Sequence, residues 1–339
     1  MLNVGIGLTS RCNCSCEHCY SRIYGNNAFL DTDLLMRFFE KFQIGSVNFG
    51  TGESYFHPDF LSIIDYLNKK RVKMSVTSNG YTIAKLDDVK LAKFHDIDFS
   101  LDYPNEKMHD DSRTVGCYQM VMDGIERCRS LGITCSIAWC LTPENSPYIK
   151  DMMKLCHSLG IFLRINIYKP VEEKRGFKYK EFWNAVNNLF LYGDIVSISE
   201  GIVNAAIDNK NSLMGCNCHN LRIFPDGTMS SCVYVPNRNM TLKKACMMSE
   251  RELLCQFQKQ YEISDDEVCI QCEKFRLCKA GCMARRRISG RLRDEFCFID
   301  REEKPKFSRI VFSKSNSEMF VHSDYICTII MEPREAAMI

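Results

Sequence analysis

Cysteine is the residue type with the most chemistry to offer in this chain, because 20 of its 339 residues are cysteine. Cys12, Cys16 and Cys19 lie on one short segment with C-x3-C-x2-C spacing. Soft thiolates select an iron–sulfur cluster or zinc. Three of them on a tight loop can hold three irons of a 4Fe–4S cube and leave the fourth iron open, as a reactive cluster needs. A zinc site with His18 as the fourth ligand is the alternative interpretation.

A second group of cysteines occupies the C-terminal third of the chain, where the periodicity of helices and strands fades. Its members are Cys216, Cys218, Cys232, Cys269, Cys272, Cys278, Cys282 and Cys297. A cysteine-rich segment with little periodicity is expected where metal organises a small domain. Two structural zinc sites are the alternative to iron–sulfur clusters in this part of the chain.

The cysteine content also bears on the compartment. Residues 1–8 are too short for a signal peptide, and the late apolar run at 325–331 is far below a membrane span. We therefore expect a cytoplasmic protein that binds metal, with disulfides in an exported protein as the alternative. The formal net charge is +2, so no overall field attracts nucleic acid or a membrane, and we expect neither as a partner.

Strand-like and helical segments alternate from residue 2 to about residue 169. The predicted strands are 3–8, 46–49, 73–77, 97–101, 134–140 and 162–167, and the predicted helices are 31–42, 58–69, 87–94, 117–131, 148–159 and 179–194. Six βα units predict an α/β fold with a parallel sheet. We favour an open, partial (β/α)6 barrel over a flat doubly wound sheet. Segments 309–312 and 325–331 could pair as two further strands.

Polar residues and glycines follow three of the predicted strands, at the ends where a barrel gathers its chemistry. They are Gly50, Thr51, Gly52, Glu53, Ser78, Asn79, Ser100 and Asp102. Glycine allows the backbone to approach a ligand closely, and a carboxylate can oppose an ammonium group. Four chemistry-bearing segments on consecutive strand ends, counting the first cysteine group, predict one shared site.

The first cysteine group and its place after the first strand resemble the radical S-adenosylmethionine (SAM) superfamily. In that family three cysteines bind a 4Fe–4S cluster, and the amino and carboxylate groups of SAM chelate its open iron. The resemblance implies that Cys12, Cys16 and Cys19 bind such a cluster. The Gly50–Ser54 turn resembles the family's Gly-Gly-Glu-Pro turn, which implies that it binds the SAM amino group. Here Thr51 and Ser54 replace the usual Gly and Pro.

The next two strand ends resemble further segments of the same family. The segment 77–80 resembles the family's Thr-Asn-Gly segment, which implies SAM contacts from Ser78 and Asn79. Ser100 and Asp102 resemble its Ser-Leu-Asp segment near the ribose and carboxylate of SAM. Arg113 could pair with the SAM carboxylate, or it could be a solvated surface arginine.

The second cysteine group resembles the SPASM extension, which holds two auxiliary 4Fe–4S clusters in relatives. The resemblance implies a first auxiliary cluster on Cys216, Cys232 and Cys282, and a second on Cys269, Cys272, Cys278 and Cys297. Cys218 is the candidate fourth ligand of the first auxiliary cluster, although its spacing from Cys216 is unusually tight. The sequence leaves two alternatives for that cluster, one fully ligated by cysteine and one with an open iron for substrate.

Five arginines lie between two predicted cluster ligands, Cys282 and Cys297. They are Arg285, Arg286, Arg287, Arg291 and Arg293. Such a run is typical of nucleic-acid binding, but no aromatic residues interleave for base stacking. We therefore expect these arginines to support a negatively charged cluster or to bind an acidic substrate.

These resemblances predict an enzyme that cleaves SAM to a 5′-deoxyadenosyl radical and abstracts hydrogen from a peptide or protein side chain, leading to oxidation or cross-linking. We expect a partial barrel at 1–195, an auxiliary-cluster domain at 196–300 and a tail of unknown role at 301–339. An electron donor such as flavodoxin or ferredoxin is a further expected partner.

The alternative functions are dehydrogenation or epimerisation of a small molecule, such as an aminocyclitol or sugar, and a non-enzymatic zinc or electron-transfer protein. The small-molecule function is kept as the alternative to the peptide function because the chain starts directly in the first strand, without the leader-binding domain that many peptide maturases carry. Val233 stands where sulfatase-maturing relatives have Asp, so a formylglycine-generating role is disfavoured.

A first prediction concerns iron. Protein reconstituted anaerobically is expected to hold about twelve irons per chain, four in each of three clusters. Replacing Cys12, Cys16 and Cys19 together by Ala is expected to remove about a third of that iron and to abolish SAM cleavage, because the open iron is lost. Iron analysis and chromatography of 5′-deoxyadenosine measure the two effects. Cleavage that survives the triple change would contradict the assignment of these cysteines.

Overall fold

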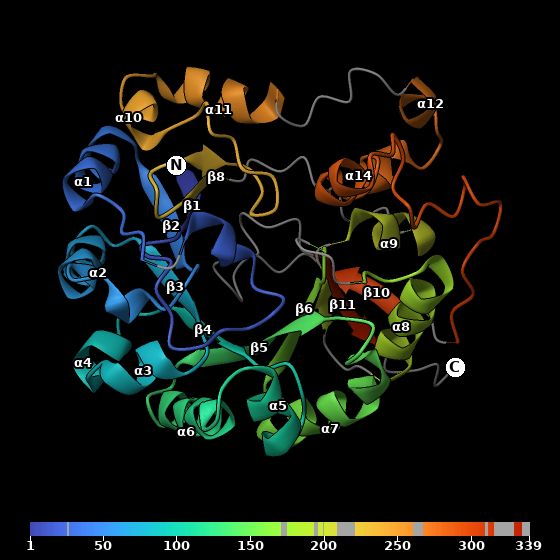
Figure 1. Ribbon diagram of the computed structural model, residues 1–339, viewed down its shortest axis with the longest axis horizontal. Coiled ribbons are helices and arrows are strands. Elements are labelled where there is room, and N and C mark those ends of the chain that lie inside the picture. The colour runs from blue at the N-terminus through green and yellow to red at the C-terminus, as the bar shows by residue number, and fades with distance from the viewer. Residues whose placement is uncertain are drawn as a thin grey trace.

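The protein is described from a computed structural model, which describes residues 1–25, 27–170, 175–192, 196–198, 200–208, 221–259, 267–308, 311–314 and 329–333. Cys216 and Cys218 lie outside the described residues. A curved sheet surrounds the interior of the molecule, and helices cover its outer face (Figure 1). This is the open α/β barrel that the alternating pattern predicts.

Parallel strands form the centre of the sheet. They are β1 (Leu2–Ile6), β2 (Ile44–Phe49), β3 (Lys73–Ser78), β4 (Asp96–Ser100), β5 (Thr134–Leu141) and β6 (Phe162–Ile167), which match the six predicted strands. Each pairs in parallel with the next strand along the chain. Their carboxyl ends therefore meet at one edge of the barrel.

The sheet extends beyond these six strands on both sides. On one side β8 (Leu221–Ile223) pairs in parallel with β1, and β9 (Met229–Ser230) pairs antiparallel with β8. On the other side β7 (Val196–Ile198) pairs with β6, followed by β11 (Ile329–Pro333) and β10 (Val311–Lys314). The two late strands β10 and β11 are antiparallel neighbours, but they begin and end later than the predicted segments, whose residues 309–310 and 325–328 lie outside the described residues.

The major helices lie close to their predicted positions. They are α1 (Thr32–Lys41), α2 (Phe60–Lys69), α6 (Cys117–Ser130), α7 (Ile149–Leu159) and α8 (Tyr179–Tyr192). Asp31 caps α1 by accepting a hydrogen bond from the Leu34 amide at 2.9 Å, and α7 ends at Gly160, whose φ of 62° is left-handed. These are the helix signals that the sequence contains.

Shorter helices were less predictable. The predicted helix 87–94 forms only as α4 (Asp88–Leu91), while α3 (Tyr81–Lys85) and α5 (Glu106–Ser112) were not predicted. Helices this short have too few residues to show a clear hydrophobic period. The core lies between the sheet and the outer helices, where the Phe49 ring meets the Phe60 ring edge-on at 5.3 Å.

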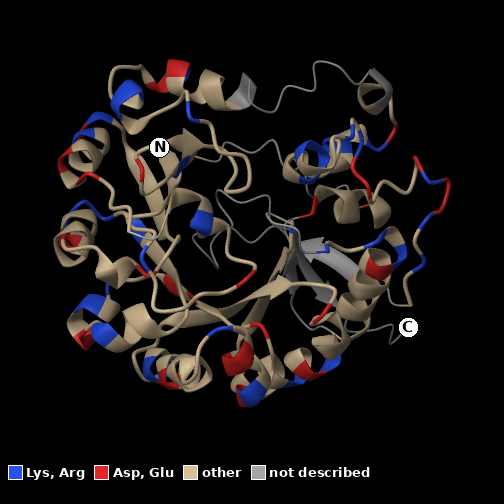
Figure 2. Ribbon diagram, in the orientation of Figure 1, with Lys and Arg blue, Asp and Glu red and all other residues tan. Residues whose placement is uncertain are grey.

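The C-terminal third adds short helices beside the open part of the barrel: α9 (Gly201–Ala206), α10 (Leu242–Ala245), α11 (Glu250–Lys259), α12 (Glu267–Ile270), α13 (Phe275–Cys278) and α14 (Met283–Ser289). Basic and acidic residues are both spread over the outer helices of the barrel, whereas α14 carries basic residues (Figure 2). In the part of the chain that the structure describes, every helix is too short or too polar to cross a membrane.

Candidate functional site

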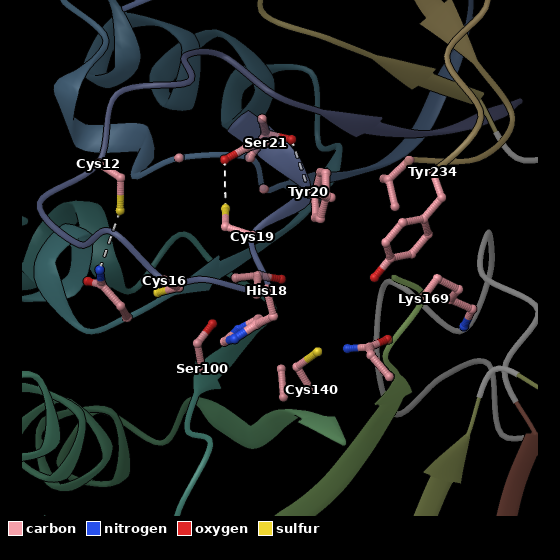
Figure 3. A pocket seen from close by; sticks show the side chains of 18 of the residues that line it. Cys12, Cys16, His18, Cys19, Tyr20, Ser21, Ser100, Cys140, Lys169 and Tyr234 are labelled. Atoms are coloured by element: carbon pink, nitrogen blue, oxygen red, sulfur yellow. Dashed lines mark hydrogen bonds between the residues drawn. The ribbon is translucent and has the colours of Figure 1, made fainter. Parts of the chain in front are cut away.

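A cavity of about 290 Å³ opens at the carboxyl ends of the parallel strands (Figure 3). It brings together most of the residues predicted to bind the cofactor. Those that line it are Cys12, Cys16, Cys19, Gly50, Thr51, Gly52, Glu53, Asn79, Ser100 and Arg113. Cys232 and Cys282 from the second cysteine group line the same cavity. Members of both cysteine groups therefore line one cavity.

The turn after β2 packs directly against the segment that leads into the cysteine loop. Gly52 has a left-handed φ of 62°, and a Cβ atom there would lie 2.5 Å from the carbonyl oxygen of Thr9. The Glu53 amide donates a hydrogen bond to the Arg11 carbonyl at 2.9 Å. Only glycine allows this approach, so Gly52 fixes the distance between the turn and Cys12.

Thr51 occupies the preceding position, where the resemblance expects glycine. Its φ of 72° is left-handed, a conformation that a β-branched residue adopts rarely and at an energetic cost. Its hydroxyl lies 3.1 Å from the Tyr20 hydroxyl, directly after Cys19. This contact ties the turn to the far end of the cysteine loop.

Glu53 is buried, and its carboxylate already accepts four hydrogen bonds from the loop after β3. The donors are the Ser78 hydroxyl at 2.8 Å, the Asn79 amide at 2.6 Å, and the amide and hydroxyl of Thr82 at 3.1 and 2.6 Å. Burial raises the pKa of Glu53, and these hydrogen bonds act in the opposite direction. Glu53 therefore positions the β3 loop, a role that the sequence motif did not reveal. Its contact with the SAM amino group stays a prediction.

Asn79 connects the Glu53 carboxylate to the cysteine loop by hydrogen bonds. Its Nδ2 donates to the side-chain Oδ1 of Asn13 at 3.0 Å and to the Cys14 sulfur at 3.0 Å, and it lies 3.6 Å from the Cys12 sulfur. A buried chain of contacts thus runs from Glu53 through Asn79 to the loop.

Arg113 is not a solvated surface residue. Only 9% of its side chain is exposed, and its Nε donates to Asp102 Oδ2 at 2.6 Å. His18 Nε2 lies 3.5 Å from the same oxygen. Burial by itself would raise the pKa of Asp102, but the Arg113 guanidinium holds it below its ordinary value. Arg113 is thereby anchored at the wall of the cavity, where it can face an anionic group.

The first cysteine group faces the cavity. Cys12, Cys16 and Cys19 all line it, so three soft thiolate donors share one space, as a 4Fe–4S cluster with an open iron would need. His18, the fourth ligand of the alternative zinc site, lies 3.5 Å from Asp102 Oδ2. Ligation by Cys12, Cys16 and Cys19 stays a prediction.

Within the described part of the second group, three pairs of thiols lie close enough to interact. Cys232 and Cys282 interact electrostatically across the cavity, and Cys278 interacts in the same way with Cys272 and Cys297. Burial raises the pKa of the Cys278 thiol to about 11. Ligation by these residues, and by Cys269 in the same segment, stays a prediction.

Arg285, from the arginine run, belongs to a buried ion network. It donates to Glu200 Oε2 at 2.7 Å and to Asp294 Oδ2 at 2.6 Å, and Lys169 donates to Glu200 Oε1 at 2.8 Å. Burial opposes ionisation of Glu200, but the two cations lower its pKa to about 2. Asp294 also accepts the Cys282 amide at 2.7 Å. The network therefore fixes Cys282 relative to the end of β6.

The other four arginines of the run lie nearer the surface. Arg286 donates to the Leu292 carbonyl at 3.2 Å, and Arg293 pairs with Asp300 at 2.5 Å. Arg287 and Arg291 are exposed. The run therefore combines one structural arginine with a solvated face.

A second prediction concerns Glu53. Glu53→Ala leaves four buried donors without their acceptor and is expected to lower the free energy of unfolding by about 1–3 kcal/mol. Urea denaturation of the anaerobic protein measures this loss. Asp65→Ala is the matched control, because Asp65 is an exposed carboxylate paired with Lys90 and Lys93. The control is expected to cost less than about 1 kcal/mol. Equal losses in the two variants would contradict the positioning role of Glu53.

A third prediction concerns Arg285. Arg285→Met leaves Asp294 and one oxygen of the Glu200 carboxylate buried without a cationic partner. The expected loss of unfolding free energy is therefore about 3–5 kcal/mol. Arg291→Met, at an exposed position of the same run, is expected to change it by less than about 0.5 kcal/mol. Chemical denaturation compares the two variants. Similar stability would show that the network contributes little.

Known proteins resemble this chain over most of its length. In sequence, it is similar to the mycofactocin maturase MftC of Mycobacterium ulcerans (strain Agy99), with 24% identity over 306 residues, or 84% of this chain and 83% of the relative. In structure, it is similar to anSMEcpe with bound AdoMet and Cp18Cys peptide, with a TM-score of 0.64 and 18% identity over 88% of this chain and 94% of the other.

SuiB of Streptococcus suis has the same fold. The complex with S-adenosylmethionine gives a TM-score of 0.69 with 16% identity, over 87% of this chain and 76% of SuiB. The complex with the precursor peptide SuiA gives 0.64 with 14% identity, over 87% and 75%. A family model described as the Radical SAM superfamily matches residues 6–156. Residues 6–156 therefore form a radical SAM domain, and that family implies S-adenosylmethionine and a 4Fe–4S cluster as cofactors.

Proposed function

We propose that this enzyme abstracts a hydrogen atom from a side chain of a peptide or protein, in a cavity shared by the SAM-binding cluster and a first auxiliary cluster. The observation that carries the proposal is the lining of that cavity. Cys12, Cys16 and Cys19 lie at one part of it, and Cys232 and Cys282 contribute from the C-terminal third. A substrate bound between them would be within reach of both cysteine groups.

Bound at Cys12, Cys16 and Cys19, the cluster would supply the electron that cleaves SAM and so generate the radical that takes the hydrogen. The residues of this chain position the reactants and exclude water. Glu53 and Asn79 order the cysteine loop, and Gly50–Glu53 together with Ser78, Asn79, Ser100, Asp102 and Arg113 are proposed to hold SAM. The electron would come from a flavodoxin or a ferredoxin.

Peptide substrates are supported by the named relatives. MftC is described as a maturase, and the structures of anSMEcpe and SuiB include complexes with a peptide. The wall between the two cysteine groups also offers binding groups. It contains Tyr20, Arg164, Asn166, Lys169, Arg222 and Tyr234, and Glu53 is the single carboxylate among the described residues that line the cavity. Oxidation or cross-linking would follow hydrogen abstraction.

The C-terminal third is proposed to hold two auxiliary clusters, one on Cys216, Cys218, Cys232 and Cys282, the other on Cys269, Cys272, Cys278 and Cys297. These clusters would accept the electron that remains on the substrate after hydrogen abstraction. The proposed cluster domain at 196–300 is joined to the barrel, because β8 pairs with β1 and Lys169 is bonded to Glu200. Residues 301–339 add β10 and β11 to the far edge of the sheet.

A fourth prediction tests the roles of the two cysteine groups separately. Reconstituted enzyme, SAM and a reductant are incubated with peptides encoded next to the gene, and mass spectrometry follows 5′-deoxyadenosine and the peptide. The expected product is a peptide lighter by two hydrogens. Cys232→Ala and Cys282→Ala are expected to retain SAM cleavage but to lose at least about 90% of the product, because the electron acceptor is damaged.

Cys255→Ala provides the matched control, since Cys255 is an exposed thiol of α11 outside the cavity. It is expected to leave both measurements unchanged. Unaltered peptide product in the Cys232 and Cys282 variants would contradict the role of the first auxiliary cluster. Product from an aminocyclitol or sugar, with none from any peptide, would favour the small-molecule alternative.

A further inference from the structure

Two thiols that belong to neither predicted ligand set meet beside the cavity. The Cys14 sulfur lies 3.0 Å from the Cys117 sulfur, although the two residues are 103 positions apart in the sequence. Cys14 is part of the cysteine loop, and Cys117 is the first residue of α6. A disulfide bond is about 2.0 Å long, so a shift of about 1 Å would allow the two sulfurs to bond.

The two thiols differ in their access to solvent. Cys14 is partly exposed and lines the cavity, whereas Cys117 is fully buried and does not. A small oxidant inside the cavity can therefore reach Cys14 but not Cys117. The Asn79 amide group donates to the Cys14 sulfur at 3.0 Å and holds it in place. An accessible thiol beside a buried partner is the arrangement of a peroxide-reactive cysteine and its resolving cysteine.

Apart from the predicted cluster ligands, which also neighbour Cys14, the other described thiols of the barrel lack this combination. Cys128 and Cys135 also neighbour each other, but both are buried and neither lines the cavity. Cys140 lines the cavity without a second thiol bonded to it in the described structure. Proximity and access coincide at Cys14 and Cys117.

We propose that Cys14 and Cys117 form a modification site that reacts with hydrogen peroxide and closes to a reversible disulfide. The Cys14 sulfur attacks one peroxide oxygen, which breaks the O–O bond; the thiol proton goes to the leaving oxygen, so the products are Cys14 sulfenic acid and water. The Cys117 thiol then displaces water from the sulfenic sulfur and forms the S–S bond. In total, two thiols lose two electrons and two protons, and one peroxide is reduced to two waters.

The disulfide would have two consequences for a protein whose cluster has been destroyed by oxidation. It would prevent further oxidation of Cys14 to sulfinic acid, which ordinary thiols do not reverse. It would also tie the emptied cysteine loop to α6, so that Cys12, Cys16 and Cys19 stay near their positions. Reduction by a dithiol would then restore a loop ready to receive a new cluster. This inference does not depend on the substrate of the enzyme.

A fifth prediction tests the site on the full-length holoenzyme. Hydrogen peroxide is added until the iron is released, free thiols are alkylated, and peptides are mapped by mass spectrometry without reduction. The Cys14–Cys117 cross-link is expected in most chains and should disappear after dithiothreitol. The Cys128–Cys135 cross-link serves as the internal control and is expected at less than about a tenth of that yield, because oxidant does not reach it.

Cys117→Ser and Cys117→Ala remove the resolving thiol without touching a predicted cluster ligand. Both variants are expected to load iron normally before oxidation. Afterwards they should accumulate Cys14 sulfinic acid and recover less than about half of the iron that the original protein recovers on reduction and reconstitution. Absence of the Cys14–Cys117 link, a yield equal to that of Cys128–Cys135, or equal iron recovery would overturn the proposal.

Discussion

Parallel hydrogen bonding between neighbouring strands is the constraint on which the site depends. From β1 to β6 each strand pairs in parallel with the next, and the paired positions run to the strand ends, as with Ile6 opposite Phe49 and Ser100 opposite Ala138. Every loop that leaves a strand therefore leaves it at the same edge. The cysteine loop, the Gly50–Ser54 turn and the Asn79 segment are brought together by this geometry, although they are far apart in the sequence.

Parallel pairing alone brings the loops near one another but does not fix their positions. Glu53 fixes them, because its buried carboxylate accepts hydrogen bonds from Ser78, Asn79 and Thr82. A carboxylate without these donors would be costly to bury, and the donors without the carboxylate would be equally costly. The three loops are thus bound to one another by groups that cannot easily be satisfied in any other arrangement.

A second buried network joins the barrel to the cysteine-rich third. Lys169, Glu200, Arg285 and Asp294 neutralise one another, so the charges tolerate burial only while all four stay in place. Asp294 also holds the Cys282 amide, which places a predicted auxiliary-cluster ligand at the cavity. The proposed electron transfer from the substrate to the auxiliary cluster would depend on this connection between the barrel and the cysteine-rich third.

Hydrophobic period, helix caps and motif spacing are local properties, so the alternation of strands and helices, the positions of the main elements and the residues at the strand ends could be predicted from the sequence. The motif spacing also predicted the radical SAM domain that the family model finds at residues 6–156. The burial of Arg113 against Asp102, the internal position of Arg285 and the contact between Cys14 and Cys117 could be seen in the folded structure alone. Each of these depends on a partner supplied by a distant segment. A spacing rule describes neighbours along the chain, whereas burial and ion pairing are properties of neighbours in space.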